Sequence, residues 1–544
     1  MVRRQRLAAS LLVGLIALVA ASVALLPGVA FWDTGELQSV APLMGTAHPT
    51  GFPTYVLIGW LASVVLQPFG DPAFVMNLFS AICVAVAAAV TVDLVRRLTG
   101  RLVLGIAAGI GLALTPTAWA MATHAETHTL HLAFVAILLW LLVAWGDRVR
   151  GRDDAADDDG HADDAAADQP SKRRDRGDRF LIAAAAVFGL ALGNHSLTIL
   201  LIVPVALYVI AVDPGIWRRP RLVLSCAGVL ALTVVLVYLE LPLRAGPFRA
   251  PLVYGTPDTW EGFKYIVLAE QFRDSVIDPF GDLPRKFGEL LTRTSTQFGI
   301  LAPLIPFAFI ATVLRRPRYA LLTGTAVAIT CFFAASYVNA DISRYYLGPE
   351  LIAWTWLAIL AAAVVDILAG LAGEETGDAR ASNDTDAPFV WTAAAMIATI
   401  LAVALLVPTL LDVPSRSRAV DANRQLGAAT WTDHALEAME PNAAIVSWWS
   451  YSTPLWYAQK VQGRRRDIAI IDDRTRLDEN LGGLTDVIDA NLGKRPVYVI
   501  RTDTNEIRML AGRYDLDYID GGDARSLTRV IGLKGAPAPS APPD

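Results

Sequence analysis

The sequence predicts a polytopic α-helical membrane protein with a small α/β domain toward its carboxyl end. The 544-residue chain is 54% hydrophobic and only 18% charged, a balance that soluble proteins of this length rarely show. Apolar runs of about 20 residues, which can cross a bilayer as helices, recur between short charged connectors. After about residue 412 the pattern changes to alternating strand-type and helix-type segments, which is typical of an α/β domain.

About eleven apolar runs are expected to cross the membrane. The fifth and sixth are short and are separated only by Gly-Asn-His-Ser, so residues 180–212 form either one bent helix or two helices that meet at a broken turn. The runs occupy residues 8–28, 73–95, 102–120, 127–146, 180–193, 196–212, 221–242, 296–314, 319–338, 347–371 and 389–411.

Arginine clusters on alternate connectors predict the orientation. They fall on one side of the membrane, which the positive-inside rule makes cytoplasmic, so the amino terminus lies inside and the carboxyl-terminal segment outside. The rule also favours two crossings within 180–212, since a single crossing would turn the fourth cluster outward. The clusters lie at residues 3–6, 96–101, 148–179, 218–221 and 315–318.

The chain therefore divides into a transmembrane domain at residues 1–412 and an extracytoplasmic α/β domain at 413–534. Within the first domain, 151–178 is expected to be a disordered cytosolic loop and 373–388 a similar connector, because dense charge cannot bury a core. The tail at 535–544 is expected to be disordered.

The α/β domain is expected to contain a parallel sheet. Its predicted helices are residues 421–439, 453–462 and 477–490, and its predicted strands are residues 443–449, 467–472 and 496–500.

Composition excludes several function classes. The net charge of −6, with arginines in short clusters rather than along one face, indicates that no nucleic-acid partner is to be expected. Cys83, Cys226 and Cys331 each lie inside an apolar run, so neither a disulfide framework nor a CxxC metal site is expected. The α/β domain lacks the glycine-rich nucleotide-binding motifs.

The strongest candidate site follows the first apolar run. Asp33 and Glu36 stand three residues apart in FWDTGEL, so a helical turn would place both carboxylates on one face. Acidic residues near the bilayer are costly and usually mark a functional site. The alternative is that Asp33 caps the next helix and Glu36 completes its first turn. His48 follows in HPTGFP, where two prolines predict a rigid turn.

Histidines gather on the same outward side as this acidic segment. His124, His128 and His131 are spaced by four and three residues and would line one helical face beside Glu126, which suggests a metal-binding site. The alternative is a polar stripe that faces other helices. No metal or other cofactor is predicted, although a divalent metal is not excluded. The five outward histidines are His48, His124, His128, His131 and His195.

Two further segments offer candidate substrate-binding residues. Asn194 and His195 interrupt an apolar run, and polar groups at such breaks either line a cavity or form an interhelical hydrogen bond. Asp341, Arg344 and Tyr345 follow the ninth run, where the planar donors of an arginine suit phosphate. Alternatively, Asp341 and Arg344 pair with each other.

Aromatic residues cluster in SWWSYSTPLWY, at the carboxyl end of the first predicted strand of the α/β domain. Open α/β sheets bind ligands at such ends, so these rings are suited either to stacking on a sugar or to seating the domain on the membrane interface. They are Trp448, Trp449, Tyr451, Trp456 and Tyr457.

Taken in order, six motifs make the chain resemble a membrane family of the glycosyltransferase C superfamily related to protein O-mannosyltransferases. The motifs are DTGE at 33–36, AHPTGFP at 47–53, NLFSA at 77–81, AETHTLH at 125–131, GLALGNHSLT at 189–198, and SYSTPLWYAQKVQGRRRDIAIID from 450.

This resemblance implies a glycosyltransferase C fold and transfer of a hexose such as mannose from a polyprenyl-phosphate sugar to an extracytoplasmic protein or glycan. Asp33 would match the acidic loop residue of the family and act as general base. Glu36 would position the acceptor, and His48, His195 or Arg344 would bind the lipid phosphate. The chain departs from the family pattern at Thr50, where a second proline is common.

A second departure concerns Trp448 to Thr453, where the family has an acid-rich stretch, and it puts a ligand role for that loop in doubt. Two rival functions remain open. A transporter or flippase would predict inverted repeats and charges near the bilayer midplane, neither of which is evident. A noncatalytic scaffold would keep its function when Asp33 is changed to Asn.

Overall fold

The computed structural model describes residues 2–151, 170–339, 341–372, 392–519 and 527–535. The chain forms two compact units, each assembled from separate stretches of sequence. Unit 1 comprises Met1–Leu25, Ser80–Tyr238 and Gln271–Asp421, and unit 2 comprises Leu26–Phe79, Leu239–Glu270 and Ala422–Asp544. The division therefore differs from the one predicted at residue 412, because two earlier stretches pack with the carboxyl-terminal segment.

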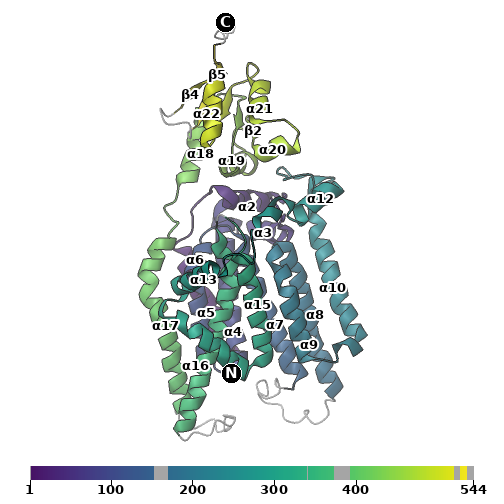
Figure 1. The fold of residues 1–544 in the computed structure, drawn as a ribbon, viewed down its shortest axis with the longest axis vertical. Helices are drawn as coiled ribbons and strands as arrows, with labels where there is room; N and C mark the ends of the chain where they lie inside the picture. The colour runs from purple at the N-terminus through teal and green to yellow at the C-terminus, as the bar shows by residue number, and fades with distance from the viewer. Residues whose placement is uncertain (1, 152–169, 340, 373–391, 520–526, 536–544) are drawn as a thin grey trace. The chain divides into compact units, whose positions relative to one another are not determined.

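Unit 1 consists of long apolar helices (Figure 1). Across the described residues, nine helical segments are long and apolar enough to cross a membrane. They are Arg4–Ser22, Pro72–Thr99, Thr127–Val149, Gly177–Asn194, Pro220–Ala245, Leu283–Arg315, Pro317–Ala334, Ile342–Leu371 and Ala393–Val420. Nine of the predicted runs overlap these segments. The runs at 102–120 and 196–212 contain only shorter apolar helical segments, Leu102–Ala113 and Ser196–Val212.

The helices that lie mainly in unit 1 are α1 (Val2–Ser22), α4 (Pro72–Thr99), α5 (Leu102–Ala113), α6 (Pro116–Met121), α7 (Thr127–Val149), α8 (Pro170–Asn194), α9 (Ile202–Val212), α10 (Pro220–Tyr238), α13 (Leu283–Phe298), α14 (Ile305–Arg315), α15 (Pro317–Ala334), α16 (Leu347–Leu371) and α17 (Ala393–Val420). Short 3-10 segments at Ser196–Leu201, Gly299–Leu304 and Ile342–Tyr346 lead into α9, α14 and α16.

Proline sets several helix starts, since its missing N–H is no loss in the first turn and its fixed φ suits a helix. Helices α4, α6, α8, α10 and α15 all begin with proline. The same property corrects one prediction. The run at 102–120 is not one helix, because α5 ends at Ala113 and Pro116 begins α6.

The predicted loop at 151–178 lies partly within the described residues. Residues 152–169 lie outside the described residues, as do the connector at 373–388 and the tail from residue 536. Residues 170–178 were expected to belong to the loop but form the first turns of α8. Proline at the first position and the lysine and arginines that follow it are favourable to helix formation.

Small residues allow α4 and α5 to pack closely in unit 1. A β-carbon on Gly105 would lie 2.3 Å from the carbonyl oxygen of Val92, and one on Gly109 would lie 2.7 Å from that of Ala88. Close backbone approach at small residues is the usual way in which membrane helices associate, since lipid provides no hydrophobic drive between them.

Unit 2 is built on a five-stranded sheet with the order β2-β1-β3-β5-β4. Strand β1 pairs in parallel with β2 and β3, whereas β5 pairs antiparallel with β3 and β4. The predicted parallel sheet is therefore correct for three strands, and an antiparallel pair extends it. The strands are β1 (Ala444–Val446), β2 (Ala469–Ile471), β3 (Val497–Val499), β4 (Tyr514–Tyr518) and β5 (Thr528–Leu533).

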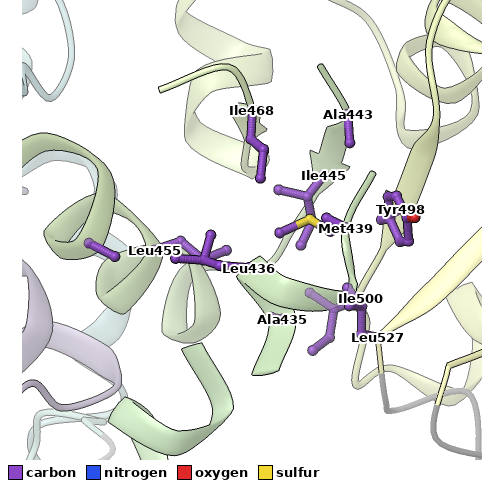
Figure 2. Packing of buried hydrophobic residues seen from close by; sticks show 11 residues of the cluster. Ala435, Leu436, Met439, Ala443, Ile445, Leu455, Ile468, Tyr498, Ile500 and Leu527 are labelled. Carbon is purple, nitrogen blue, oxygen red and sulfur yellow. The ribbon is translucent and has the colours of Figure 1, made fainter. Parts of the chain in front are cut away.

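Helices cover both faces of this sheet. Ile445 and Tyr498 point into one buried cluster with residues of α18 and α19 (Figure 2), whereas Val446 and Val499 point into a second cluster with residues of α21 and α22. Successive side chains of a strand alternate in this way between faces. The helices of unit 2 are α2 (Trp32–Leu43), α3 (Pro53–Val65), α11 (Glu240–Ala245), α12 (Trp260–Val267), α18 (Gly427–Ala438), α19 (Trp449–Trp456), α20 (Asp473–Asp478), α21 (Leu484–Asn491) and α22 (Thr504–Arg513).

Candidate functional site

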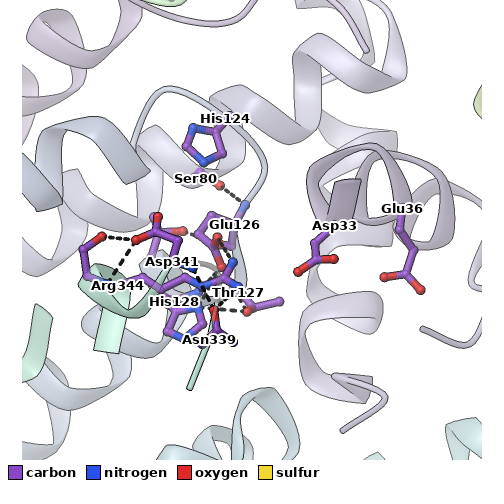
Figure 3. A network of polar contacts seen from close by, with 12 residues as sticks. Asp33, Glu36, Ser80, His124, Glu126, Thr127, His128, Asn339, Asp341 and Arg344 are labelled. Atoms are coloured by element: carbon purple, nitrogen blue, oxygen red, sulfur yellow. Dashed lines mark hydrogen bonds and ion pairs between the residues drawn. The ribbon is translucent and has the colours of Figure 1, made fainter. Parts of the chain in front are cut away.

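Helix α2 of unit 2 carries the two predicted catalytic carboxylates, Asp33 and Glu36 (Figure 3). The predicted helical turn is present. The capping alternative is wrong, because the N-cap of α2 is Phe31 and no side chain caps this helix. Trp32 adopts a φ of +61°, a left-handed conformation that costs about 1 kcal/mol in a non-glycine residue. The backbone immediately before Asp33 is therefore strained.

His48 holds Glu36. The backbone N–H of His48 donates to Glu36 Oε1 at 2.8 Å, and the ring Nδ1 contacts Glu36 Oε2. Glu36 is 1% exposed, and this burial raises its pKa, whereas His48 acts in the opposite direction. The HPTGFP turn thus closes over the acidic helix and fixes the orientation of one of its two carboxylates.

Asp33 lies in a more open setting than Glu36. Its side chain is half-buried, and Trp449 of α19 donates its indole N–H to Asp33 Oδ1 at 3.2 Å. The Trp449 ring also lies edge-on to the rings of His48 and Tyr254, with centroids 5.9 and 5.7 Å apart. One aromatic residue of the SWWSYSTPLWY segment therefore contacts both halves of the acidic site.

Two buried amides fix the chain that leads into α2. Gln38 accepts from the N–H of Ala30 at 2.9 Å, and its Nε2 donates to Gly28 O at 3.0 Å and to Asn77 Oδ1 at 2.8 Å. Asn77 in turn donates to Leu26 O at 2.8 Å. This network satisfies the irregular backbone between Leu26 and Ala30, which would otherwise be costly to bury.

Gly35 allows close packing around the same helix. A β-carbon at this position would lie 2.2 Å from Ala30 O and 2.7 Å from Thr453 Oγ1. The glycine of the DTGE motif therefore has a steric purpose, since any side chain would push α2 away from α19.

A second polar group lies in unit 1 and is centred on an ion pair. Arg344 Nη1 donates to Glu126 Oε2 at 2.9 Å, although 218 residues separate the two in sequence (Figure 3). Glu126 is also the N-cap of α7: it accepts from the N–H of His128 at 3.2 Å, and the His128 ring lies 2.7 Å from the same oxygen. Its own N–H donates to Ser80 Oγ at 3.0 Å.

Electrostatics keep Glu126 ionised. Burial alone would raise its pKa, but the positive charge of Arg344 and the contact with His128 outweigh burial and hold the pKa well below its usual range. The alternative in which Asp341 and Arg344 simply pair with each other is thus incomplete, because Arg344 also compensates the charge of Glu126 at the start of α7. Asp341 accepts instead from the N–H of Ser343 at 3.0 Å and from its hydroxyl group.

Three histidines pack together beside this ion pair. The ring centroid of His195 lies 4.3 Å from that of His128 and 6.2 Å from that of His131, and Tyr345 stacks on His128 at 5.1 Å. Asn194 donates to Thr127 O at 3.0 Å. A cavity of about 20 Å³, enough for roughly one water molecule, is lined by His131 and Tyr345 among other residues.

The predicted stripe of His124, His128 and His131 is only partly present. His128 and His131 lie on α7, but His124 precedes the helix and is not on its face. His195 takes the third place in the cluster, since the chain leaves α8 at Asn194 and His195 caps the following turn by accepting from the N–H of Leu197. In the described ranges no group of three or more His, Cys, Asp or Glu is arranged to hold a metal ion.

The predicted site residues thus fall into two groups. Asp33, Glu36 and His48 come together in unit 2, and Glu126, Asn194, His195, Arg344 and Tyr345 come together in unit 1, with Asp341 in the turn before Arg344. The sequence analysis did not single out Gln38 and Asn77 as site residues. Their signal was a pair of amides within otherwise apolar segments, and Asn77 opens the NLFSA motif.

Comparison with known proteins identifies related sequences. Residues 33–215 match the family model of the protein O-mannosyl-transferase TMEM260 N-terminal domain. The match includes all site residues up to His195. The chain is 29% identical over 365 residues to the protein O-mannosyl-transferase TMEM260 of Mus musculus, an alignment that covers 62% of this chain. It spans only 45% of the length of that relative.

Solved structures share the fold. ArnT from Cupriavidus metallidurans bound to undecaprenyl phosphate superposes with a TM-score of 0.56 at 16% identity, covering 95% of this chain and 97% of ArnT. The apo state of the same protein gives 0.57 at 14% identity with the same coverage. The family model and the mouse relative confirm the predicted resemblance to proteins related to protein O-mannosyl-transferases. The shared fold confirms the predicted fold class, a polytopic helical membrane protein with a small carboxyl-terminal α/β domain.

Proposed function

We propose that this chain is a membrane glycosyltransferase that moves a hexose, such as mannose, from a polyprenyl-phosphate donor to an extracytoplasmic acceptor hydroxyl, such as that of serine or threonine. The observation that carries the proposal is the acidic helix α2, where a half-buried Asp33 stands beside a Glu36 that His48 holds. An acid in a partly open setting is suited to proton transfer, and a buried, engaged acid is suited to positioning.

Similarity supports the reaction class and the two substrates. The matched family model carries the name of a protein O-mannosyl-transferase, which suggests a mannosyl group and a protein acceptor. A structure with the same fold binds undecaprenyl phosphate, which suggests a polyprenyl-phosphate donor. Since arginines cluster on the opposite connectors, the proposed reaction takes place on the extracytoplasmic side.

Asp33 would act as general base. It would take the proton of the acceptor hydroxyl while the acceptor oxygen forms a bond to the anomeric carbon, and the bond from that carbon to the lipid phosphate oxygen would break. The leaving group is then the polyprenyl phosphate, which carries away the electron pair. A positioned base contributes about 10²- to 10⁴-fold in rate.

Glu36 and His48 would hold the acidic helix and the following turn in place for the acceptor. The indole of Trp449, which donates to Asp33, would fix the orientation of the base.

The unit 1 cluster would bind the anionic part of the donor. Arg344 presents a planar set of N–H donors that matches phosphate oxygens. Glu126 orients the guanidinium group, while His195, Asn194 and Tyr345 line the same cluster. A positive group near the lipid phosphate would stabilise its growing charge as the sugar leaves.

A transfer assay tests the base. Purified protein in detergent would be incubated with radiolabelled polyprenyl-phosphate mannose and an acceptor protein rich in serine and threonine, and label on the acceptor would be counted. We expect Asp33→Asn to lower the rate by about 10²-fold or more. Asp515→Asn, an exposed acid on β4, is the matched control and should leave the rate unchanged.

Two outcomes would contradict the proposal. Equal rates for wild type and Asp33→Asn, with equal thermal midpoints, would remove the general-base role. Absence of transfer by the wild type from lipid-linked mannose, glucose and galactose donors alike would overturn the glycosyltransferase assignment for this class of donor.

A further inference from the structure

A second recess lies in unit 2, at the edge of the sheet and within residues 456–495. It is a cleft of about 510 Å³, a size typical of ligand sites. Its walls come from both layers that cover the sheet: Trp456, Gln459 and Lys460 on one side, and Val487, Ala490 and Asn491 on the other. Between them runs β2, whose residues Ala469, Ile470 and Ile471 form the floor.

Strand β2 is an edge strand. It pairs with β1 on one side only and stands first in the sheet order. An edge strand presents backbone N–H and C=O groups that can pair with another extended chain. Native proteins usually protect such an edge, and here it opens into the cleft.

The register shows which backbone groups face the cleft. Ala469 donates its N–H to Ala443 O at 2.9 Å, and Ile471 O accepts from the N–H of Ser447 at 2.9 Å. Alternate residues of a strand direct their backbone groups to opposite sides. The N–H and C=O of Ile470 are therefore directed away from β1 and toward the cleft, so they form one donor and acceptor pair for an added strand.

The charges around the cleft are mostly positive. Lys460, Arg466 and Arg495 line it and are exposed, whereas Glu479 is its one acidic lining residue. Neighbouring arginines are compensated: Arg464 pairs with Asp433 and Arg465 pairs with Asp467. No ion pair is recorded for the three cleft cations within the described part of the chain, so their charge remains available to an anionic ligand.

We propose that this cleft, formed by the β2 edge and its three cations, binds an extended acidic segment of polypeptide as an added strand. Backbone hydrogen bonds to Ile470 would supply affinity, and the flanking cations would select aspartate- or glutamate-rich sequences. Resting on the proposed function, this site serves to hold the acceptor protein by a segment separate from the hydroxyl that receives the sugar.

Peptide binding to the full chain in detergent tests the proposal without any donor. The probe is a fluorescent ten-residue peptide of alternating glutamate and valine, followed by anisotropy. We expect saturable binding that weakens about tenfold or more, roughly 1.4 kcal/mol, when Arg466→Glu and Arg495→Glu are combined. Arg508→Glu, an exposed arginine on α22 outside the cleft, is the matched control and should change the affinity less than twofold.

A second peptide separates strand addition from simple charge attraction. The same sequence with a methyl group on every backbone nitrogen keeps its charge but cannot donate a backbone hydrogen bond to β2, and we expect it to bind at least tenfold more weakly. Equal binding of the methylated peptide would overturn strand addition, and equal binding to the double variant would overturn this location. Competition by an acidic oligosaccharide that matches the peptide in affinity would also overturn a polypeptide occupant.

The two proposals fail separately. Sugar transfer by a wild type that binds no acidic peptide would retain the enzyme assignment and remove the docking cleft. Peptide binding by a wild type that transfers no sugar would do the reverse.

Discussion

The Glu126–Arg344 ion pair should stabilise unit 1, and the free energy of unfolding lost when the pair is removed can be measured separately from catalysis. The perturbation is a double-mutant cycle of Glu126→Gln, Arg344→Gln and both together. At position 126, glutamine keeps an acceptor oxygen that can still receive the hydrogen bond from the N–H of His128 and so cap α7. The substitution therefore removes mainly the negative charge.

The geometry sets the expected size of the effect. Arg344 Nη1 lies 2.9 Å from Glu126 Oε2, and the side chains are 16% and 5% exposed. At an effective dielectric constant of about 20, two unit charges at this distance attract by roughly 6 kcal/mol, from which the cost of desolvating both charges is subtracted. Removing one partner of a buried pair costs about 3–5 kcal/mol, since it leaves an uncompensated charge.

Unfolding in detergent, followed by tryptophan fluorescence against denaturant, would give the four free energies of the cycle. We expect each single variant to lose about 3 kcal/mol, the lower value because both side chains retain some contact with water. The double variant should lose about 1–3 kcal/mol less than the sum of the two. Sugar transfer should remain impaired in the double variant, since it still lacks the guanidinium group of Arg344.

A coupling energy near zero would refute the reasoning, because it would mean that the two charges do not interact across α7 and the turn before α16. Full recovery of transfer in the double variant would refute the proposed role of Arg344 in phosphate binding and leave the ion pair with a purely stabilising role.

Two further predictions concern packing and pH. Gly35→Ala should destabilise the protein by about 1–3 kcal/mol and slow transfer, because the new β-carbon meets Ala30 O and Thr453 Oγ1; Gly348→Ala, which meets nothing within 4 Å, should be neutral or slightly stabilising in the same unfolding assay. The lowered pKa of Glu126 means that stability from its ionised form is present above its unfolded pKa and is lost only as pH falls through the lower folded value. The stability difference between wild type and Glu126→Gln should therefore stay constant from pH 7 to about pH 5, and a decline already between pH 7 and 6 would contradict it.

Long apolar runs were enough to predict the helical framework. A segment that crosses the bilayer must satisfy its backbone polar groups within a helix and must present apolar side chains to lipid, so each crossing leaves a long apolar run in the sequence. Where proline interrupts the run, as at Pro116, length alone was misleading. The antiparallel strands β4 and β5 were not predicted, since YDLDY and TRVIGL are short and their pairing depends on contacts with β3 rather than on their own composition.

The site was predictable by residue type and not by pairing. Asp33, Glu36 and His48 are close in sequence, so the motif placed them together. Glu126 and Arg344 stand 218 residues apart, and only the tertiary structure reveals that they form an ion pair. The capping interpretation of Asp33 failed for a local reason: the left-handed Trp32 starts α2 one residue before the first acid.

The discontinuous make-up of unit 2 limits how this protein can be cut and recombined. Residues 26–79 and 239–270 cluster with 422–544, and the indole of Trp449 donates to Asp33 across 416 positions of sequence. A chimera that exchanges only the carboxyl-terminal segment with a relative would join a native acidic helix to a foreign partner surface. Grafting the three stretches together is the exchange that keeps those contacts, so sequence changes in one stretch are expected to be accompanied by changes in the others as the lineage diverges.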